Sequence, residues 1–152
     1  MSKKLLTGFA AFCVMGLSSS VWATDFGTAD EAKMMLEKAV AAVQADEAKA
    51  LAAFNKGEGG FKEKDLYVFC GGADGNFTAH GAKAELVGKS LKGLKDKAGK
   101  ALGEEIYKEA HEGAFVEVTY MWPRPGEEKP SEKVVYAEKV GDQICAVGYY
   151  KP

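Results

Sequence analysis

Three strand-like runs in close succession end the chain, and they constrain the fold more than any other feature. Residues 114–122, 133–140 and 143–150 are rich in β-branched and aromatic side chains, which favour strands. The last two runs are joined by Gly141-Asp142, a dipeptide typical of a hairpin turn. A connection this short can join only antiparallel neighbours. The sequence therefore predicts an antiparallel sheet in the C-terminal third.

A second hairpin is predicted upstream. The run "DLYVFC", residues 65–70, is again rich in aromatic and β-branched residues. The Asp74-Gly75 pair that follows marks a tight turn, and "FTAHG", residues 77–81, has the character of a return strand.

Helices are predicted at the start of the chain and between the two groups of strands. Thr28 and Glu31 form the T-x-x-E pattern of a capping box. Apolar residues then recur at helical spacing as far as Phe54. This pattern fits one long amphipathic helix, or two in tandem with a break near Asp46. A lysine- and glycine-rich stretch, and a short helix that starts at Ala101 and ends at Gly113, connect the second strand to the third.

This order of elements predicts an α+β fold. We expect a five-stranded antiparallel sheet with the long N-terminal helix packed on one face. The helical and loop connection between strands two and three would cover the other face as a lid. A lid over a sheet is a natural place for a small-molecule pocket.

The first residues have the pattern of a secretory signal. Lys3 and Lys4 precede a short apolar run, and Val21 and Ala23 are small residues at the −3 and −1 positions of a cleavage site. The alternative is a buried N-terminal helix. We expect residues 1–23 to be a cleaved signal peptide and residues 24–152 to be a single domain of a periplasmic or secreted protein.

The predicted mature chain is short and mildly acidic. It has 129 residues, the length of one ordinary domain. Without Lys3 and Lys4 it has 18 basic and 22 acidic residues, a formal charge of −4. That balance gives no reason to expect nucleic acid as a partner. No second apolar run of membrane length exists, so we expect no membrane insertion of the mature chain.

Two cysteines remain after cleavage, Cys70 and Cys145. An even pair in an exported protein predicts a disulfide; the alternative is two buried free thiols. No histidine or third cysteine stands at metal-ligand spacing. The sequence also has no C-x-x-C-H motif for haem and no phosphate loop. We expect neither a metal nor a cofactor.

Catalysis has little support in the sequence. None of the common hydrolase or metalloprotease motifs is present. Of the two histidines, His111 lies in a charged helical stretch and is expected on the surface. His80 closes the second strand. It is either a hydrogen-bonded residue at a strand end or a polar group at the edge of a pocket. We expect a non-enzymatic protein.

The segment "YMWPRP", residues 120–125, is the strongest candidate for a binding site. Alternate residues of a strand share a face, so Tyr120, Trp122 and Arg124 are predicted to point the same way. The two prolines restrict the segment to a sheet edge or a strand end. An aromatic wall with a fixed guanidinium suits a small carboxylate. Lys133 and Tyr136 from the next strand could line the same face. Alternatively, Trp122 packs against the lid and Arg124 is a surface cation.

Several segments together are similar to a known family. The pieces "DLYVFC", "DGNFTAHGAKAELVGKSLKGLKDKAGK", "VTYMWPRPG", "EKVVYAEKV" and "GDQICAVGYY" occur in the order in which a single Cache domain has them. Cache domains are the extracellular sensor modules of bacterial chemoreceptors and kinases. The resemblance implies a PAS-like sheet that binds small organic acids between sheet and lid. The positions that it implies as ligand-binding are His80, Trp122, Arg124 and Tyr136, with Tyr67, Phe69, Tyr120 and Lys133.

The sequence departs from the Cache pattern in two places. "GAKAEL" from Gly81 replaces the proline- and asparagine-containing text usual after A-H, so we expect a different pocket rim. The chain also stops two residues after Tyr150. It therefore resembles a stand-alone periplasmic binding module, which would capture a small organic acid and present it to a membrane receptor or transporter. The alternative is a non-catalytic protein that uses the fold to dock a partner.

Overall fold

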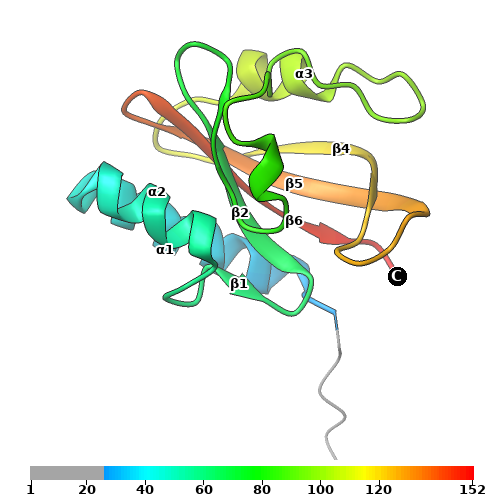
Figure 1. Cartoon of the computed structure of the whole chain (residues 1–152), viewed down its shortest axis with the longest axis horizontal. Helices are drawn as coiled ribbons and strands as arrows, with labels where there is room; N and C mark the ends of the chain where they lie inside the picture. The colour runs from blue at the N-terminus through cyan, green and yellow to red at the C-terminus, as the bar shows by residue number, and fades with distance from the viewer. Residues whose placement is uncertain (1–25) are drawn as a thin grey trace, which may run out of the picture.

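The computed structural model describes residues 26–152. The predicted signal peptide and its cleavage site lie outside the described residues. The fold has three layers, which Figure 1 shows as two N-terminal helices, a twisted sheet, and an irregular layer that contains helix α3. This confirms the predicted α+β architecture.

The N-terminal helical pattern forms two helices, α1 (Ala29–Ala45) and α2 (Glu47–Lys56). The capping box of Thr28 and Glu31 is present. The break falls at Asp46, which has extended backbone angles and accepts a hydrogen bond from Lys49 N. An aspartate side chain satisfies a free N–H at a helix start better than it suits a helix interior, so Asp46 ends one helix and begins the next.

The sheet is antiparallel, and its longest path runs in the order β1-β2-β6-β5-β4. Its strands are β1 (Lys62–Glu63), β2 (Leu66–Gly71), β3 (Phe77–His80), β4 (Val116–Pro123), β5 (Pro130–Val140) and β6 (Gln143–Tyr150). Strand β3 pairs with β2 outside this path. The five predicted strands are present, and the short β1 is an addition that the sequence did not reveal. Strand β4 is an edge strand that ends at Pro123, as the two prolines predicted.

One face of the sheet, the helix face, packs against α1 and α2. Its core is almost wholly apolar and includes Leu36 and Phe54 from the helices and Val68, Val134 and Val147 from the sheet, each fully buried. Burial of such side chains supplies the main stabilisation of this layer, about 1.5–3 kcal/mol each.

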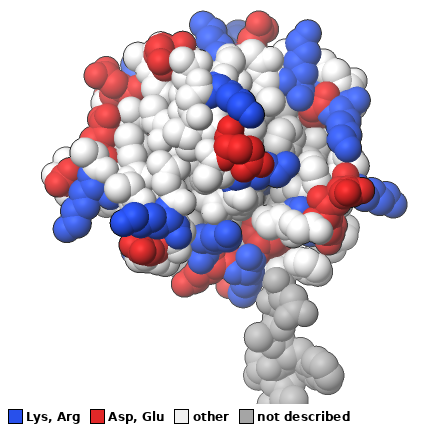
Figure 2. All heavy atoms as spheres, in the orientation of Figure 1, with Lys and Arg blue, Asp and Glu red and all other residues white. Residues whose placement is uncertain are grey.

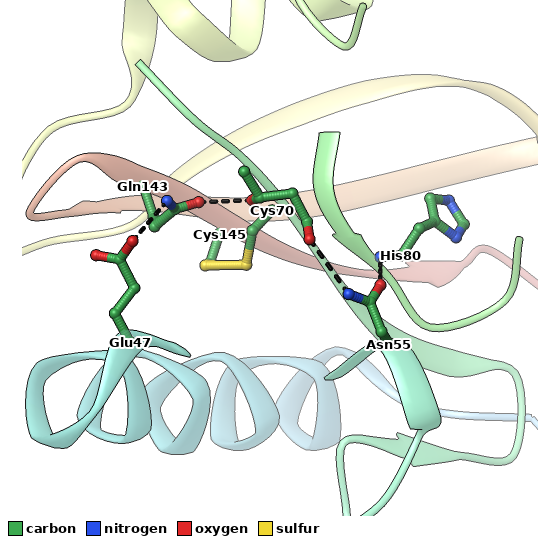
Figure 3. The surroundings of a disulfide bond; sticks show 7 residues. Glu47, Asn55, Cys70, His80, Gln143 and Cys145 are labelled. Carbon is green, nitrogen blue, oxygen red and sulfur yellow. Dashed lines mark hydrogen bonds between the residues drawn. A yellow bond between two sulfur atoms is a disulfide. The ribbon is translucent and has the colours of Figure 1, made fainter. Parts of the chain in front are cut away.

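The disulfide predicted between Cys70 and Cys145 is present. The two cysteines are directly opposite each other on β2 and β6 and are fully buried in the helix-face core. Figure 3 shows the bond between the sheet and the α2 helix. It joins residues 75 positions apart. A closed loop of that length contributes roughly 4 kcal/mol in the chain-entropy description.

The other face of the sheet, the lid face, is covered by the connection between β3 and β4. This lid contains the short helical turn η1 (Ala84–Leu86) and helix α3 (Leu102–Glu109). The predicted end of the helix at Gly113 was wrong by four residues. The last helical residue is Glu109, the backbone of the next residue, Ala110, is extended, and Gly113 instead takes a positive φ of 84° in the following turn.

Asp96 fastens the lid to the sheet. Its Oδ1 accepts hydrogen bonds from Ala98 N and Lys100 N within the lid. Its Oδ2 accepts one from Met121 N on β4, at 3.0 Å. These three backbone donors lower the pKa of the carboxyl, the Met121 bond most strongly. The carboxylate therefore holds an irregular segment in a defined place on the sheet.

The described residues contain no helix that is both long and apolar enough to cross a membrane. Figure 2 shows basic and acidic side chains interspersed on the face in view, without an extended patch of one sign.

Candidate functional site

A small cavity lies between the lid and the lid face of the sheet. Aromatic side chains from the sheet form its floor, and leucines of the lid form its roof. Its lining residues are Tyr67, Phe69, Phe77, His80, Leu91, Leu94, Leu102, Tyr120 and Trp122. The space open to the centre of a water-sized sphere is about 10 Å³, which is room for about one water molecule. A larger molecule could enter only if the lid moved.

Lys133 is a buried cation beside this cavity. Its side chain is on the lid face of β5, opposite Tyr120 on β4 and Tyr150 on β6, and it is 1% exposed. Gly148 gives it room, because a Cβ there would lie 2.5 Å from Lys133 Cε. Burying an ammonium is costly unless it is paired, so the neighbours of this group decide what it can do.

Those neighbours are aromatic and neutral. Lys133 Nζ donates to the hydroxyl of Tyr67 at 2.9 Å. It also lies 4.2, 5.7 and 5.2 Å from the ring centroids of Tyr67, Phe69 and Tyr150, which provide cation–π attraction. None of the ion pairs within residues 26–152 includes Lys133. The described protein thus gives this ammonium one hydrogen-bond acceptor and no carboxylate.

Two of the tyrosine hydroxyls near Lys133, those of Tyr120 and Tyr150, have raised pKa values. Burial raises the pKa of Tyr120 well above its usual range, and the negative charge of an ionised Tyr67 would raise it further. Burial likewise raises the pKa of Tyr150, whose hydroxyl donates to Pro123 O at 2.7 Å. Neither Tyr120 nor Tyr150 therefore supplies a negative charge to the lysine at ordinary pH.

His80 also lines the cavity, and its ring is held by hydrogen bonds. Its Nδ1 accepts from Ala82 N and Lys83 N, at 3.2 and 2.9 Å, so the neutral ring carries its proton on Nε2. Burial, followed by the positive charges of Lys133, Lys83 and Lys62, lowers its pKa to about 3. The ring packs against Tyr67, Phe77 and Phe69, whose centroids are 4.9, 5.5 and 5.9 Å away.

Trp122 lies at the half-buried edge of the cavity. Its ring meets that of Tyr120 edge-on, with centroids 6.2 Å apart. Lys83, from the rim that departs from the Cache pattern, lies 5.5 Å from the Trp122 ring centroid. Movement of the rim would therefore change the surroundings of the indole.

The structure brings most of the predicted site residues together on the lid face. These are His80, Trp122, Tyr120, Lys133, Tyr67 and Phe69. Whether they bind a ligand stays a prediction.

Arg124 is not among the residues that line this cavity, so its predicted placement beside Trp122 in a pocket was wrong. Its Nε lies 3.5 Å from Oδ2 of the buried Asp65. The guanidinium stacks on the rings of Phe26 and Tyr150, 4.5 and 5.1 Å from their centroids. Strand β4 ends at Pro123, so strand alternation no longer determines the direction of Arg124. The buried carboxylate attracts the arginine instead.

Tyr136 was also placed wrongly. Its ring belongs to the helix-face core, where it stacks on Tyr149 with centroids 6.1 Å apart and meets Phe115 edge-on. Lys133 and Tyr136 are three residues apart on one regular strand, so their side chains point to opposite faces. Only Lys133 can reach the cavity.

The sequence reading missed several residues of this region. Tyr150 faces Lys133 through the β5–β6 register, and alternation along β6 would have placed it on the lid face. Phe77 could have been found in the same way on β3. Of the three lid leucines, Leu91 and Leu94 come from an irregular segment that has no periodicity from which to find them, and Leu102 is the first residue of α3.

Comparisons with known proteins identify the family to which this fold belongs. A family profile described as "Cache domain" matches residues 32–150. The chain belongs to the Cache domain family. Cache domains are sensor domains that are typically non-catalytic. Within the described residues, no group of three or more histidine, cysteine, aspartate or glutamate side chains could hold a metal ion. A search of curated proteins found no match.

Solved structures of chemotaxis sensors are similar to this Cache domain. A methyl-accepting chemotaxis protein from Vibrio parahaemolyticus RIMD 2210633 is 25% identical, with a TM-score of 0.65 over 80% of this chain and 86% of that one. A periplasmic sensor domain of a chemotaxis protein is 21% identical, with a TM-score of 0.59 over 81% and 90%. A Cache chemosensory domain, solved to explain carboxylic acid recognition, is 17% identical, with a TM-score of 0.62 over 81% and 92%.

Proposed function

We propose that this protein is an exported sensory module that binds a small organic acid under the lid and relays it to a membrane receptor or transporter. The observation that carries the proposal is Lys133, a buried ammonium without a carboxylate partner among the described residues. An ammonium has three donors, and only the bond to Tyr67 uses one of them. A ligand carboxylate would supply the missing charge and acceptors.

The charges around the cavity favour an acid with one carboxylate. Lys133 is the buried cation available to it, because Arg124 is paired with Asp65 and His80 stays neutral through its lowered pKa. Lys83 lies at the edge of the cavity, against the Trp122 ring. A second carboxylate would lie among leucine and aromatic side chains, where an unpaired charge is costly. The same lining suits a short apolar tail, and His80 Nε2 can donate to one ligand oxygen.

Binding in this site requires the lid to open and close again. The cavity has room for about one water molecule, so an acid must displace lid side chains as it enters. A ligand that binds one lid arrangement better than another shifts the population toward it. The lid would thereby convert the presence of the acid into a change of shape that a membrane partner can read.

An extracytoplasmic location agrees with the observations. The disulfide is typical of proteins in an oxidising compartment. The Vibrio parahaemolyticus protein, a structural neighbour, is named as a methyl-accepting chemotaxis protein. For another neighbour, the printed title reports carboxylic acid recognition. Both are consistent with a chemosensory role for the acid-binding module proposed here.

A thermal-shift screen with tryptophan fluorescence tests the proposal. The panel compares monocarboxylates of increasing chain length with dicarboxylates and amino acids. A ligand at 100 times its Kd adds about 2.7 kcal/mol to the free energy of unfolding. We expect a monocarboxylate to raise the melting temperature and to change Trp122 fluorescence, since Trp122 is the one tryptophan left after cleavage of the predicted signal.

Two variants of β5 show whether Lys133 is responsible. Lys133→Met removes the ammonium and keeps a side chain of similar length. Lys139→Met makes the same change at an exposed position of the same strand. The response to the acid should disappear in the first variant and persist in the second. An unchanged response in Lys133→Met, or no response of the wild-type protein to any acid, would contradict the proposal.

A further inference from the structure

Strand β3 ends in His80. On the edge of β3 that faces away from β2, its backbone groups are hydrogen-bonded by a side chain of helix α2. The register places Ala79 opposite Cys70 of β2. Thr78 and His80, one residue to either side, direct their backbone groups away from β2. The amide of Asn55 meets both: Oδ1 accepts from His80 N at 2.9 Å, and Nδ2 donates to Thr78 O at 3.2 Å. One side chain from α2 thus replaces a peptide group of a neighbouring strand.

Only asparagine and glutamine carry a donor and an acceptor of this kind on one side chain. The orientation of the amide is fixed by its partners, since a backbone N–H can only donate and a carbonyl can only accept. Asn55 is the next-to-last residue of α2, and the helix ends at once in Gly57, which has a φ of 65°. The amide is therefore held where the helix stops.

The other end of α2 is tied to the same strand. Glu47, the first residue of α2, accepts from Gln143 Nε2 at 3.0 Å. Gln143 Oε1 in turn accepts from the hydroxyl of Thr78 at 2.6 Å. Figure 3 shows these bonds in a row from Glu47 through Gln143 to the strand, and from the strand through Asn55 to His80. The helix is thereby attached to the residues that carry the pocket histidine.

We propose that Asn55 is a positioning residue, which fixes His80 so that Nε2–H points into the lid-face cavity. This rests on the proposed function for its effect on ligand binding, but its effect on the imidazole can be measured without a ligand. Asn55 holds the backbone of His80, while Ala82 N and Lys83 N hold Nδ1. Release of the backbone allows the ring to leave the two N–H groups that determine its tautomer.

Histidine-selective ¹⁵N NMR tests this directly, because the chain contains only His80 and His111. The exposed His111 is assigned with His111→Gln. In the wild-type protein we expect the His80 ring to stay neutral, with its proton on Nε2, from about pH 8 down to about pH 4.5. The charged groups near it are Lys133, Lys83 and Lys62, all cations that oppose protonation.

Two variants of Asn55 are compared with a control on the same helix. Asn55→Ala removes both bonds, and Asn55→Asp keeps the acceptor but puts an oxygen against the Thr78 carbonyl. Ala50→Gly weakens α2 without removing the amide. In both Asn55 variants we expect the His80 ring signals to move and the ring to titrate nearer the usual histidine range. With propionate as the probe, Kd should rise about tenfold, the loss expected for one misplaced hydrogen bond. Ala50→Gly should change neither quantity.

The two proposals fail in different ways. If the Asn55 variants melt at a lower temperature, as is expected for Ala50→Gly, but keep the wild-type His80 signals and titration, Asn55 is only structural and the inference is overturned. If the wild-type protein does not bind propionate, that result counts against the acid-binding proposal and not against the role of Asn55. The ring titration alone then decides the role of Asn55. Asn55→Asp preserves this test if Asn55→Ala does not fold.

Discussion

The two faces of the sheet are built on opposite principles. The helix face is apolar, closely packed and crossed by a buried disulfide. The lid face buries an unpaired lysine, a neutral histidine and several tyrosine hydroxyls under an irregular connection. The helix face is arranged for stability. The lid face keeps polar groups that the described residues do not fully supply with hydrogen-bond partners or an opposite charge. Such local conflicts are typical of functional sites.

Loss of the disulfide should produce the largest change in stability, because it acts on the helix face. Replacement of both Cys70 and Cys145 by alanine is expected to lower the free energy of unfolding by about 2–5 kcal/mol. Urea denaturation of the variant and the wild-type protein measures the difference. Acid binding under the lid should survive in the folded variant. If the folded variant also lost its affinity for the acid, the idea that the helix face and the lid face have separate roles would be contradicted.

Arg124→Met tests the ion pair at the end of the sheet. It leaves the buried carboxylate of Asp65 without its cation and should cost about 1–3 kcal/mol. The double variant Arg124→Met/Asp65→Asn removes both charges, and its asparagine can still accept from Gly27 N. It should recover part of the loss, as judged by denaturation midpoints. Affinity for an acid should change little, whereas a selective loss of affinity would restore Arg124 to the binding site.

His80 gives the lid face a characteristic dependence on pH. Its folded pKa is lowered to about 3, so between about pH 6.5 and pH 3 the unfolded chain binds a proton that the folded protein does not. Stability from this group is fully present above pH 6.5 and falls with decreasing pH, by about 2 kcal/mol at pH 5. Denaturation of the wild-type protein and of His80→Gln at pH 7.5 and pH 5 isolates the difference. Equal losses in the two proteins would show that His80 titrates normally.

Lys133→Met should have the smallest effect on stability. Replacement of a buried, unpaired charge by an apolar side chain of similar length is often neutral or stabilising, so we expect the free energy of unfolding to stay within about 1 kcal/mol or to rise. Denaturation against the exposed control Lys139→Met checks this. A large loss of stability would mean that Lys133 supports the fold rather than a ligand.

Local pattern in the sequence was enough to predict the helices, the main strands and the disulfide. Capping, helical spacing and strand alternation are written into neighbouring residues, and Asp46 even marked the break between α1 and α2. Strand alternation would also have placed Tyr136 correctly. It is three residues from Lys133 on β5, so its side chain lies on the opposite face of the sheet, the helix face. The rest depended on distant partners. Asp65, which pairs with Arg124, lies in the connection between β1 and β2, far from Arg124 in the sequence. The lid is held in place by Asp96, which accepts a hydrogen bond from Met121 N on β4.

The central claim is that a carboxylate completes the charge of Lys133. A crystal structure of the protein with the monocarboxylate that raises its melting temperature most tests it directly. The account predicts that the ligand carboxylate is within hydrogen-bonding distance of Lys133 Nζ, with its tail among the lid leucines and one oxygen near His80 Nε2. An acid bound at Arg124 with Asp65 displaced, or bound outside the lid with Lys133 unchanged, would contradict it.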